Sequence, residues 1–264
     1  MSRVERWFSG YAFDLDGTIY LGDSLLPHAA DTIRRIRATG ARVVFMTNKP
    51  LETAADYAAK LSVLGIDAAA GDVVTALDSL LLYLDERHGR ATILPVAEPL
   101  VAETLSQRGF AITADPAAAE LVVASFDRTF DYAKLNSAYR ALRLYGAALI
   151  GTNPDPYCPT SDGGLPDCAA MLAAIEACSG VKAEAVLGKP SSYMARAVLT
   201  RLDVPPEQAA MVGDRLATDV AMARSAGLTG ILVLTGATLP DDVHRSSVKP
   251  DFVLHGLDEL LPGA

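Results

Sequence analysis

The chain has 264 residues, and half of them are hydrophobic, which is enough for a sizeable core and excludes global disorder. Its formal net charge of −9 repels nucleic-acid phosphates and anionic membranes, so we expect no nucleic-acid partner and no membrane attachment. The N-terminus lacks a signal-peptide pattern and no apolar run is long enough to span a bilayer, which predicts a cytoplasmic protein.

Strand-like and helix-like segments alternate from the N-terminus onward. The apolar run at residues 11–13 stops at an acidic turn, and a helical pattern after Pro27 precedes a second apolar run at residues 43–46. A further helix is predicted over residues 54–64, where it ends at a glycine. This order is typical of a parallel sheet with helices on both faces.

The middle and the C-terminal third of the chain each repeat this alternation. The middle contains strand-like runs at residues 92–94, 121–123 and 147–150 and a turn-rich stretch at 152–164; the C-terminal third has helices at 193–202 and 219–226 and strands at 209–212, 231–234 and 252–254. We therefore predict a doubly wound, Rossmann-like α/β core formed by residues 1–90 and 185–264. A second α/β domain, residues 91–184, is inserted into it.

Polar side chains follow three of the strands predicted for the core domain. Asp14 and Asp16 follow the first strand, Thr47 and Asn48 the second, and Asp214 the third. Ligands bind at the carboxyl ends of the strands in open α/β sheets, so the coincidence of three such ends predicts a functional site there.

The carboxylates suggest acid–base, covalent or metal chemistry. Asp14 and Asp16 are two residues apart on an extended segment, which predicts that their side chains leave the same side of the strand. Such a pair serves as an acid/base pair, a metal site, or a nucleophile with its proton shuttle, although a strand-ending turn also explains the pair alone. Asp219 follows Asp214 at a helix start, where plain capping is the alternative. Converging carboxylates with oxygen-only ligands favour Mg²⁺.

The uncharged donors and one lysine suit a phosphate group. Thr47 and Asn48 offer a hydroxyl and amide donors at a strand end, where a turn with a helix cap is the alternative. Lys189 lies between Gly188 and Pro190, which restrict the backbone and allow the ammonium to be aimed at one point. Taken alone, such a lysine is normally a solvated surface charge.

These residues form four motifs in the order of a known superfamily. The segments 14–18 (DLDGT), 47–48 (TN), 188–190 (GKP) and 213–219 (GDRLATD) resemble the motifs of the haloacid dehalogenase (HAD) superfamily. The segments 125–128 (SFDR) and 151–155 (GTNPD) are similar to its NagD-like, or 4-nitrophenylphosphatase-like, branch (subfamily IIA), which carries a large α/β cap between the second and third motifs. Lys49 departs from the pattern, because many relatives have a second Asn there.

The resemblance implies a Mg²⁺-dependent phosphatase that works through an aspartyl phosphate. The implied roles are Asp14 as nucleophile, Asp16 as general acid and base, Thr47, Asn48 and Lys189 as phosphate ligands, and Asp14, the Asp16 carbonyl and Asp214 as metal ligands, with Asp219 orienting these or binding through water. Asp127, Arg128, Asn153 and Asp155 in the inserted domain are candidate specificity residues, for which an ordinary turn role is the alternative.

Several functional alternatives stay open at this point. The expected substrate is a small phosphomonoester, such as a sugar phosphate, glycerol phosphate, phosphoglycolate, pyridoxal phosphate or a nucleoside monophosphate. A phosphomutase would pass the phosphoryl group on instead of releasing it. A non-catalytic phosphate- or nucleotide-binding module is disfavoured, because no Gly-x-Gly-x-x-Gly follows the first strand. Cap-mediated dimers occur among the proteins that the chain resembles, so both a monomer and a homodimer are compatible with the sequence.

Overall fold

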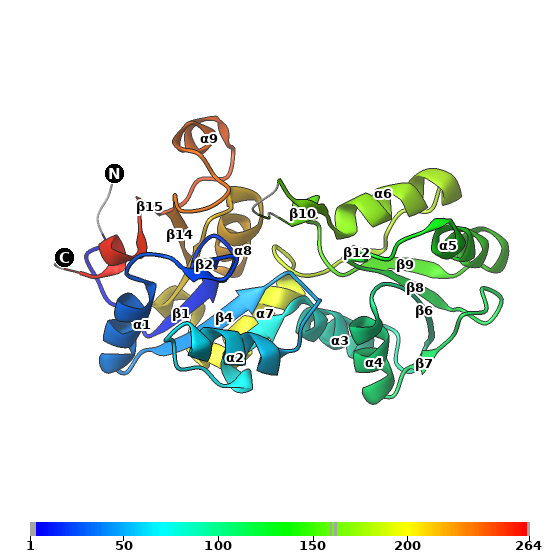
Figure 1. Cartoon of the computed structure of the whole chain (residues 1–264), viewed down its shortest axis with the longest axis horizontal. Coiled ribbons are helices and arrows are strands. Elements are labelled where there is room, and N and C mark those ends of the chain that lie inside the picture. The colour runs from blue at the N-terminus through cyan, green and yellow to red at the C-terminus, as the bar shows by residue number, and fades with distance from the viewer. Residues whose placement is uncertain (1–3, 159, 161–162, 263–264) are drawn as a thin grey trace. The chain divides into compact units, whose positions relative to one another are not determined.

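The computed structural model describes residues 4–158, 160 and 163–262. The chain forms two compact units (Figure 1). The core unit comprises Met1–Thr47, Ala54–Val74 and Lys189–Ala264, and the inserted unit comprises Asn48–Thr53 and Thr75–Gly188. Both units contain a sheet flanked by helices, which gives the predicted α/β fold.

A six-stranded sheet forms the centre of the core unit. In spatial order its strands are β15 (Phe252–Leu254), β14 (Thr229–Val233), β13 (Ala209–Gly213), β1 (Gly10–Asp14), β4 (Arg42–Thr47) and β5 (Val73–Thr75). Neighbouring strands from β15 to β4 run parallel. Their carboxyl ends therefore meet at one edge, where the predicted site residues follow them.

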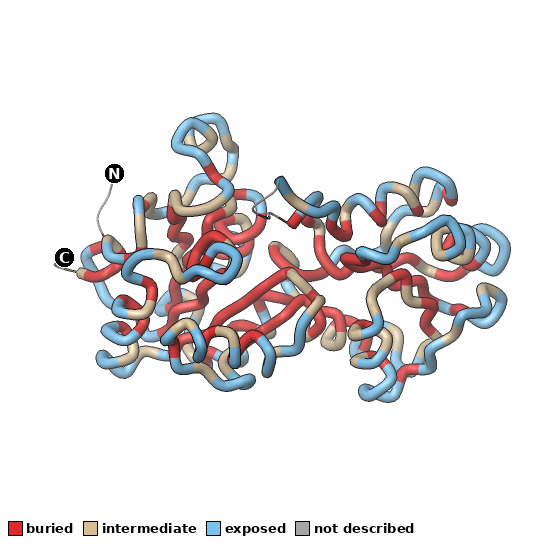
Figure 2. Tube along the Cα trace, in the orientation of Figure 1, coloured by how far each residue is buried: buried red, intermediate tan, exposed pale blue. Residues whose placement is uncertain are grey.

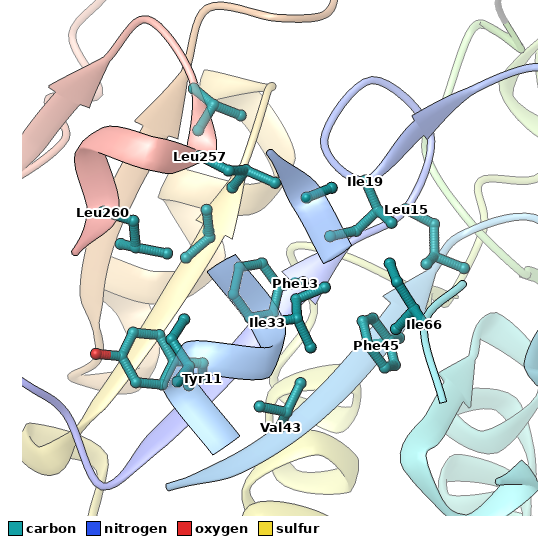
Figure 3. Packing of buried hydrophobic residues seen from close by; sticks show 14 of the residues in the cluster. Tyr11, Phe13, Leu15, Ile19, Ile33, Val43, Phe45, Ile66, Leu257 and Leu260 are labelled. Atoms are coloured by element: carbon teal, nitrogen blue, oxygen red, sulfur yellow. The ribbon is translucent and has the colours of Figure 1, made fainter. Parts of the chain in front are cut away.

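Both faces of this sheet are buried beneath helices. The helices are α1 (Ala29–Ala38), α2 (Ala54–Val63), α7 (Ser192–Leu202), α8 (Ala221–Ala226) and α9 (Pro240–Arg245), with shorter helical turns η1 (Ala70–Asp72), η2 (Pro206–Gln208), η3 (Leu216–Val220) and η4 (Leu257–Leu260) and a hairpin of β2 (Tyr20–Leu21) and β3 (Ser24–Leu25). Tyr11 and Phe13 of β1 pack in the hydrophobic cluster that contains Ile33 of α1 (Figure 3). Ala12 belongs to the cluster with Val198 of α7. Successive residues of β1 thus serve opposite faces, as the pleat requires.

The inserted unit has its own sheet and its own core. Its parallel strands are, in spatial order, β12 (Ala185–Val186), β9 (Ala148–Gly151), β8 (Leu121–Ala124), β6 (Thr92–Val96) and β7 (Ala111–Ile112), and its helices are α3 (Ala76–Arg87), α4 (Pro99–Gln107), α5 (Tyr132–Tyr145) and α6 (Cys168–Ser179), with a hairpin of β10 (Tyr157–Cys158) and β11 (Leu165–Pro166). The central strands of both units are buried along their length (Figure 2). Leu142 of α5 and Ile175 of α6 pack with Val122 of β8 in one buried cluster.

The boundary between the units differs from the predicted residue 91. The inserted unit already begins at Thr75 and therefore includes α3. Two hydrogen bonds explain why α3 belongs there: Gly188 N donates to Ser79 Oγ at 3.3 Å, and Tyr83 Oη donates to Glu184 Oε1 at 2.5 Å.

Among the described residues, no helix has both the length and the apolar character that crossing a membrane requires.

Candidate active site

The carboxyl edge of the core sheet gathers three buried carboxylates. Asp14 is the last residue of β1, Asp214 follows β13, and Asp219 lies in the helical turn η3. One carboxylate oxygen from each of the three lies within 4.8 Å of the other two. We refer to Asp14, Asp214 and Asp219 as the carboxylate cluster. Its donor set consists of oxygen alone, which suits Mg²⁺.

Lys189 places one positive charge beside this cluster. Its ammonium forms ion pairs with Asp14 Oδ1 and, at 2.8 Å, with Asp219 Oδ1. The lysine is 3% exposed, so it is not the solvated surface charge of the alternative interpretation. Although burial disfavours the charged ammonium, the Asp14 and Asp219 carboxylates outweigh it and raise the pKa of Lys189 above its usual range.

The carboxylates carry more negative charge than one ammonium balances. Burial raises the pKa of Asp14, with Lys189 opposing the shift. Burial and the neighbouring Asp14 and Asp219 raise the pKa of Asp214 to about 8. Burial likewise raises the pKa of Asp219 to about 6 against the pull of Lys189. A divalent cation would remove this repulsion and return the carboxylates to their ionised forms.

Asp214 has one oxygen fixed and one without a hydrogen-bond partner. Oδ2 accepts from the Ala237 amide at 2.6 Å, whereas Oδ1 is buried and has no hydrogen-bond partner among the described residues. A buried, unpaired carboxylate oxygen is costly unless a cation or a proton compensates it. The residues present therefore fit a divalent metal ion.

Two glycines make room for the Asp214 side chain. Gly17 has φ +89°, and a Cβ there would lie 2.7 Å from Asp214 Oδ2. A Cβ on Gly236 would overlap the same carboxylate. Thr235 completes the contact by donating its hydroxyl to the Gly17 carbonyl at 2.6 Å. The sequence analysis missed residues 235–237, although they follow the carboxyl end of a fourth parallel strand, β14, which was the available signal.

Asp16 follows the end of β1, at a point where the chain turns. The strand ends at Asp14, and the Leu15 carbonyl accepts from the amides of Thr18, Ile19 and Tyr20, so the chain turns immediately. Asp16 is half-buried and its carboxylate is not in the carboxylate cluster, although its charge adds to the raised pKa of Asp14. The resemblance assigned the Asp16 carbonyl, not its carboxylate, to the metal.

The two polar residues that follow β4 fall into different units. Thr47 is the last residue of β4 and is buried in the core unit, whereas Asn48 belongs to the inserted unit. Asn48 Nδ2 donates to Asp155 Oδ2 at 2.8 Å, and Asn153 Nδ2 donates to the same oxygen at 3.1 Å. Asp155 thus joins Asn48, a predicted phosphate ligand, to Asn153, which like Asp155 is a predicted specificity residue.

Asp167 extends this group and was not singled out from the sequence. Its Oδ1 accepts from Asn153 Nδ2 at 3.1 Å and from the Cys168 amide at 2.5 Å, at the N-terminus of α6. Burial raises its pKa to about 6, which the bonds from Cys168 and Asn153 oppose. We call Asn48, Asn153, Asp155 and Asp167 the amide–carboxylate cluster. All four are buried, with at most 8% exposure.

The other two predicted specificity residues make local contacts within the inserted unit. Asp127 Oδ1 accepts from the amide and hydroxyl of Thr129, and its Oδ2 pairs with Lys134 Nζ at 2.6 Å. Arg128 forms a two-pronged ion pair with Glu98, at 2.5 Å and 2.7 Å. These are the contacts of a structured turn, and contact with a substrate stays a prediction for both residues.

Comparisons with known proteins agree with this geometry. Residues 11–111 match the family model described as haloacid dehalogenase-like hydrolase, and residues 186–260 match that described as HAD-hydrolase-like. The chain is 31% identical to sugar-phosphatase AraL of Bacillus subtilis, across 96% of this chain and 92% of the relative. Its fold matches 4-nitrophenylphosphatase of Thermotoga maritima with a TM-score of 0.89 and 38% identity, across 96% of both chains. A glycerol phosphate phosphatase from Mycobacterium tuberculosis in complex with magnesium matches with a TM-score of 0.89 and 30% identity, across 98% of this chain and 78% of that one.

Proposed function

Since the chain belongs to the haloacid dehalogenase-like hydrolases, in their NagD-like branch, and is a phosphoric monoester hydrolase, we propose that it hydrolyses small phosphomonoesters with Mg²⁺ through an aspartyl phosphate. The observation that supports this most directly is the carboxylate cluster beside Lys189, in which Asp214 Oδ1 has no hydrogen-bond partner among the described residues. It combines a nucleophile, metal-ligand oxygens and a cation for phosphate at one sheet edge.

Asp14 and Asp214 would hold the metal through their carboxylates, together with the Asp16 backbone carbonyl. The relative crystallised with magnesium makes Mg²⁺ the first choice. When bound, Mg²⁺ offsets the repulsion between the Asp14 carboxylate and a phosphate dianion, which amounts to a few kcal/mol at an effective dielectric of about 20. Asp219 accepts from the Arg215 amide at 3.0 Å and pairs with Lys189, so its contribution is to orient the lysine.

In the first half-reaction, an oxygen of Asp14 attacks phosphorus. A bond forms between that oxygen and phosphorus while the phosphorus–oxygen bond to the leaving alcohol breaks. Asp16 donates a proton to the departing alkoxide, and its carboxylate is not one of the three in the carboxylate cluster. Lys189, Thr47 and Asn48 would hold the other phosphoryl oxygens through transfer.

In the second half-reaction, water attacks the phosphorus of the aspartyl phosphate. Asp16, now ionised, takes a proton from that water, the acyl phosphate bond breaks at phosphorus, and inorganic phosphate leaves with Asp14 regenerated. The inserted unit would serve as the cap, which excludes bulk water and selects the leaving group. Relatives named for sugar phosphates and glycerol phosphate make short polyol phosphates the first substrates to test.

Phosphate release with and without EDTA tests this proposal. Sugar phosphates, glycerol phosphate, phosphoglycolate and nucleoside monophosphates should be ranked by kcat/KM beside 4-nitrophenyl phosphate. We expect phosphate release to require Mg²⁺. In H₂¹⁸O, each released phosphate should contain one ¹⁸O atom, and the enzyme should be regenerated in each turnover. Full activity in excess EDTA would contradict the metal role. Transfer of phosphate to an added alcohol without release would identify a mutase, and binding without turnover would identify a binding module.

A further inference from the structure

Two proposed phosphate ligands lie next to a boundary between the units. Thr47 is the last core residue before the chain enters the inserted unit at Asn48, and Lys189 is the first core residue after the chain leaves it at Gly188. Each is therefore one peptide bond away from a residue of the inserted unit. Whatever fixes Asn48 and Gly188 also restricts Thr47 and Lys189, because a peptide bond is rigid and only two soft dihedrals separate neighbouring residues.

The amide–carboxylate cluster fixes the Asn48 side. Asp155 Oδ2 accepts from both Asn48 and Asn153, and Asn153 reaches on to Asp167, which caps α6. The Asn48 side chain is thereby connected through three hydrogen bonds to a helix of the inserted unit. Buried hydrogen bonds to ionised groups are among the stronger ones in proteins.

The same group of residues encloses Gly188. A Cβ on Gly188 would lie 2.7 Å from Asn48 Oδ1 and 2.9 Å from the Thr152 carbonyl, and its φ of +68° favours glycine. The Thr152 hydroxyl donates to Asn153 Oδ1 at 3.0 Å, which links the residues around Gly188 to the amide–carboxylate cluster. Asn48 and Gly188 are thus packed against one another inside the inserted unit, far apart in sequence.

The hydrogen bonds that Asn153 and Asp167 make argue against direct substrate contact by these two residues. Asn153 and Asp167 are 0% and 3% exposed, so both are enclosed by protein. Their side chains are hydrogen-bonded to each other, and Asp167 also accepts from the Cys168 amide at the α6 N-terminus. Residues in this situation position other groups and do not read a leaving group.

We propose that Asn153, Asp155 and Asp167 are positioning residues that lock Asn48 against Gly188 and thereby set where Thr47 and Lys189 meet the phosphoryl group. This proposal rests on the proposed function of those two residues. It differs from the expectation that Asn153 and Asp155 choose the substrate. A positioning defect acts on the phosphoryl group, which every substrate shares, whereas a specificity defect depends on the leaving group.

The test compares Asp155→Ala with Asp155→Asn in the full-length enzyme. Alanine removes the acceptor that the Asn48 and Asn153 amides share, and we expect kcat/KM to fall about 10- to 100-fold by the same factor on glycerol phosphate and 4-nitrophenyl phosphate. Binding of inorganic phosphate with Mg²⁺, measured by calorimetry, should weaken about two- to tenfold. Asparagine retains an acceptor oxygen and should stay within about threefold of the wild type on both substrates.

Asp167→Ala and Asp131→Ala form a matched pair. Both residues cap a helix of the inserted unit, since Asp131 accepts from the Lys134 amide at the start of α5, but only Asp167 also holds Asn153. We expect similar shifts in Tm for the two variants and loss of kcat/KM only for Asp167→Ala. This pair decides the question if thermal unfolding shows that Asp155→Ala does not fold.

The outcomes separate this proposal from the proposed function. Equal losses on every substrate, with rescue by Asp155→Asn, support it. Losses that differ between leaving groups, or unchanged kinetics in Asp155→Ala and Asp167→Ala, overturn it. If the wild type itself releases no phosphate, the proposed function fails instead, and the calorimetric affinity for inorganic phosphate still reports whether the cluster positions Thr47 and Lys189.

Discussion

Each unit of this protein buries a small group of carboxylates, and the two groups are satisfied in different ways. In the core unit, Asp214 keeps an oxygen that has no hydrogen-bond partner in the described part of the chain, and the ammonium of Lys189 faces both Asp14 and Asp219. In the inserted unit, the carboxylates of Asp155 and Asp167 accept from amides. The first arrangement contains a buried carboxylate oxygen that accepts no hydrogen bond from the described residues, whereas the second joins its carboxylates through amide donors, although burial still raises the pKa of Asp167 to about 6.

This contrast separates reactive carboxylates from structural ones. Uncompensated charge is costly, and a site that tolerates it is suited to bind a cation or to react with an electrophile. Carboxylates held by amide donors gain hydrogen bonds in the folded state and have little left to offer a ligand. In the proposed functions, the same amino acid serves chemistry in one unit and placement in the other, and substitution experiments can test the distinction.

The largest expected effect comes from making the same isosteric change in both groups. Asp14→Asn should reduce kcat by about 10⁴-fold or more, because an amide is not a usable nucleophile toward phosphorus. Asp155→Asn should leave most of the activity in place. Steady-state phosphate release measures both. If Asp14→Asn kept near-native turnover, the aspartyl phosphate mechanism would be wrong.

The structure of the carboxylate cluster gives a second test at a residue that carries no chemistry. Gly236→Ala would push a methyl group into the Asp214 carboxylate, so we expect kcat/KM to fall ~10- to 100-fold and the Mg²⁺ concentration for half-activity to rise. Gly71→Ala is the matched control in the same unit, since a Cβ there meets nothing within 4 Å. Equal activity of the two variants would show that Asp214 does not need its present position.

The sequence predicted those site residues whose positions depend on local patterns along the chain. Asp14, Thr47 and Asp214 were identified because each follows a run of apolar residues that forms a central strand. Such runs are local, and the parallel order of the strands brings their ends together. The expectation that Asp14 and Asp16 leave the same side of the strand stays a prediction, because β1 ends at Asp14 and the chain then turns through three amides that donate to the Leu15 carbonyl.

The features that escaped prediction depend on contacts between distant segments. Gly236 matters because Asp214 approaches it, and Asp167 matters because Asn153 reaches it across a hairpin. The start of the inserted unit at Thr75 depends on Ser79 and Tyr83 of α3 meeting residues more than 100 positions away. None of these pairings leaves a spacing or a composition change that a single sequence displays.

The raised pKa values predict how stability depends on pH in the absence of metal. Asp214 and Asp219 titrate near 8 and 6 in the folded protein, against an ordinary value of 3.8. Between pH 4 and 8 the folded state therefore binds more protons than the unfolded state, so the free energy of unfolding falls as the pH rises, by on the order of a few kcal/mol. Thermal unfolding in EDTA at pH 5 and pH 8 measures this loss.

Mg²⁺ and one substitution locate the origin of that pH dependence. Saturating Mg²⁺ should raise Tm more at pH 8 than at pH 5, because the metal binds ionised carboxylates. Asp214→Asn removes a carboxyl group whose pKa is raised to about 8 and should flatten the change between pH 6 and 8. Asp167, with a pKa of about 6, would leave a metal-independent slope below pH 6. A metal-free Tm that is equal at pH 5 and pH 8 would contradict the electrostatic account of the core site.

The smallest expected effect concerns the ion pair between Arg128 and Glu98 in the inserted unit. The Arg128 side chain is 54% exposed, and its hydrogen bonds hold the pKa of Glu98 below the usual range. Exposed ion pairs contribute about 0–1 kcal/mol, so Arg128→Ala and Glu98→Gln should each change kcat/KM by less than about fivefold on every substrate. The two variants should also behave alike, because each removes the attraction between opposite charges in the same pair.

A role of Arg128 in binding the leaving group would break that symmetry. Arg128→Ala would then raise KM for the preferred substrate about ten- to a hundredfold with kcat little changed, since losing a charged hydrogen bond costs about 1.5–3 kcal/mol. Glu98→Gln would not share this effect, because it retains an oxygen for the guanidinium and does not remove the arginine. Measuring both variants on glycerol phosphate and on 4-nitrophenyl phosphate therefore decides whether this turn only supports the fold of the inserted unit or also selects the substrate.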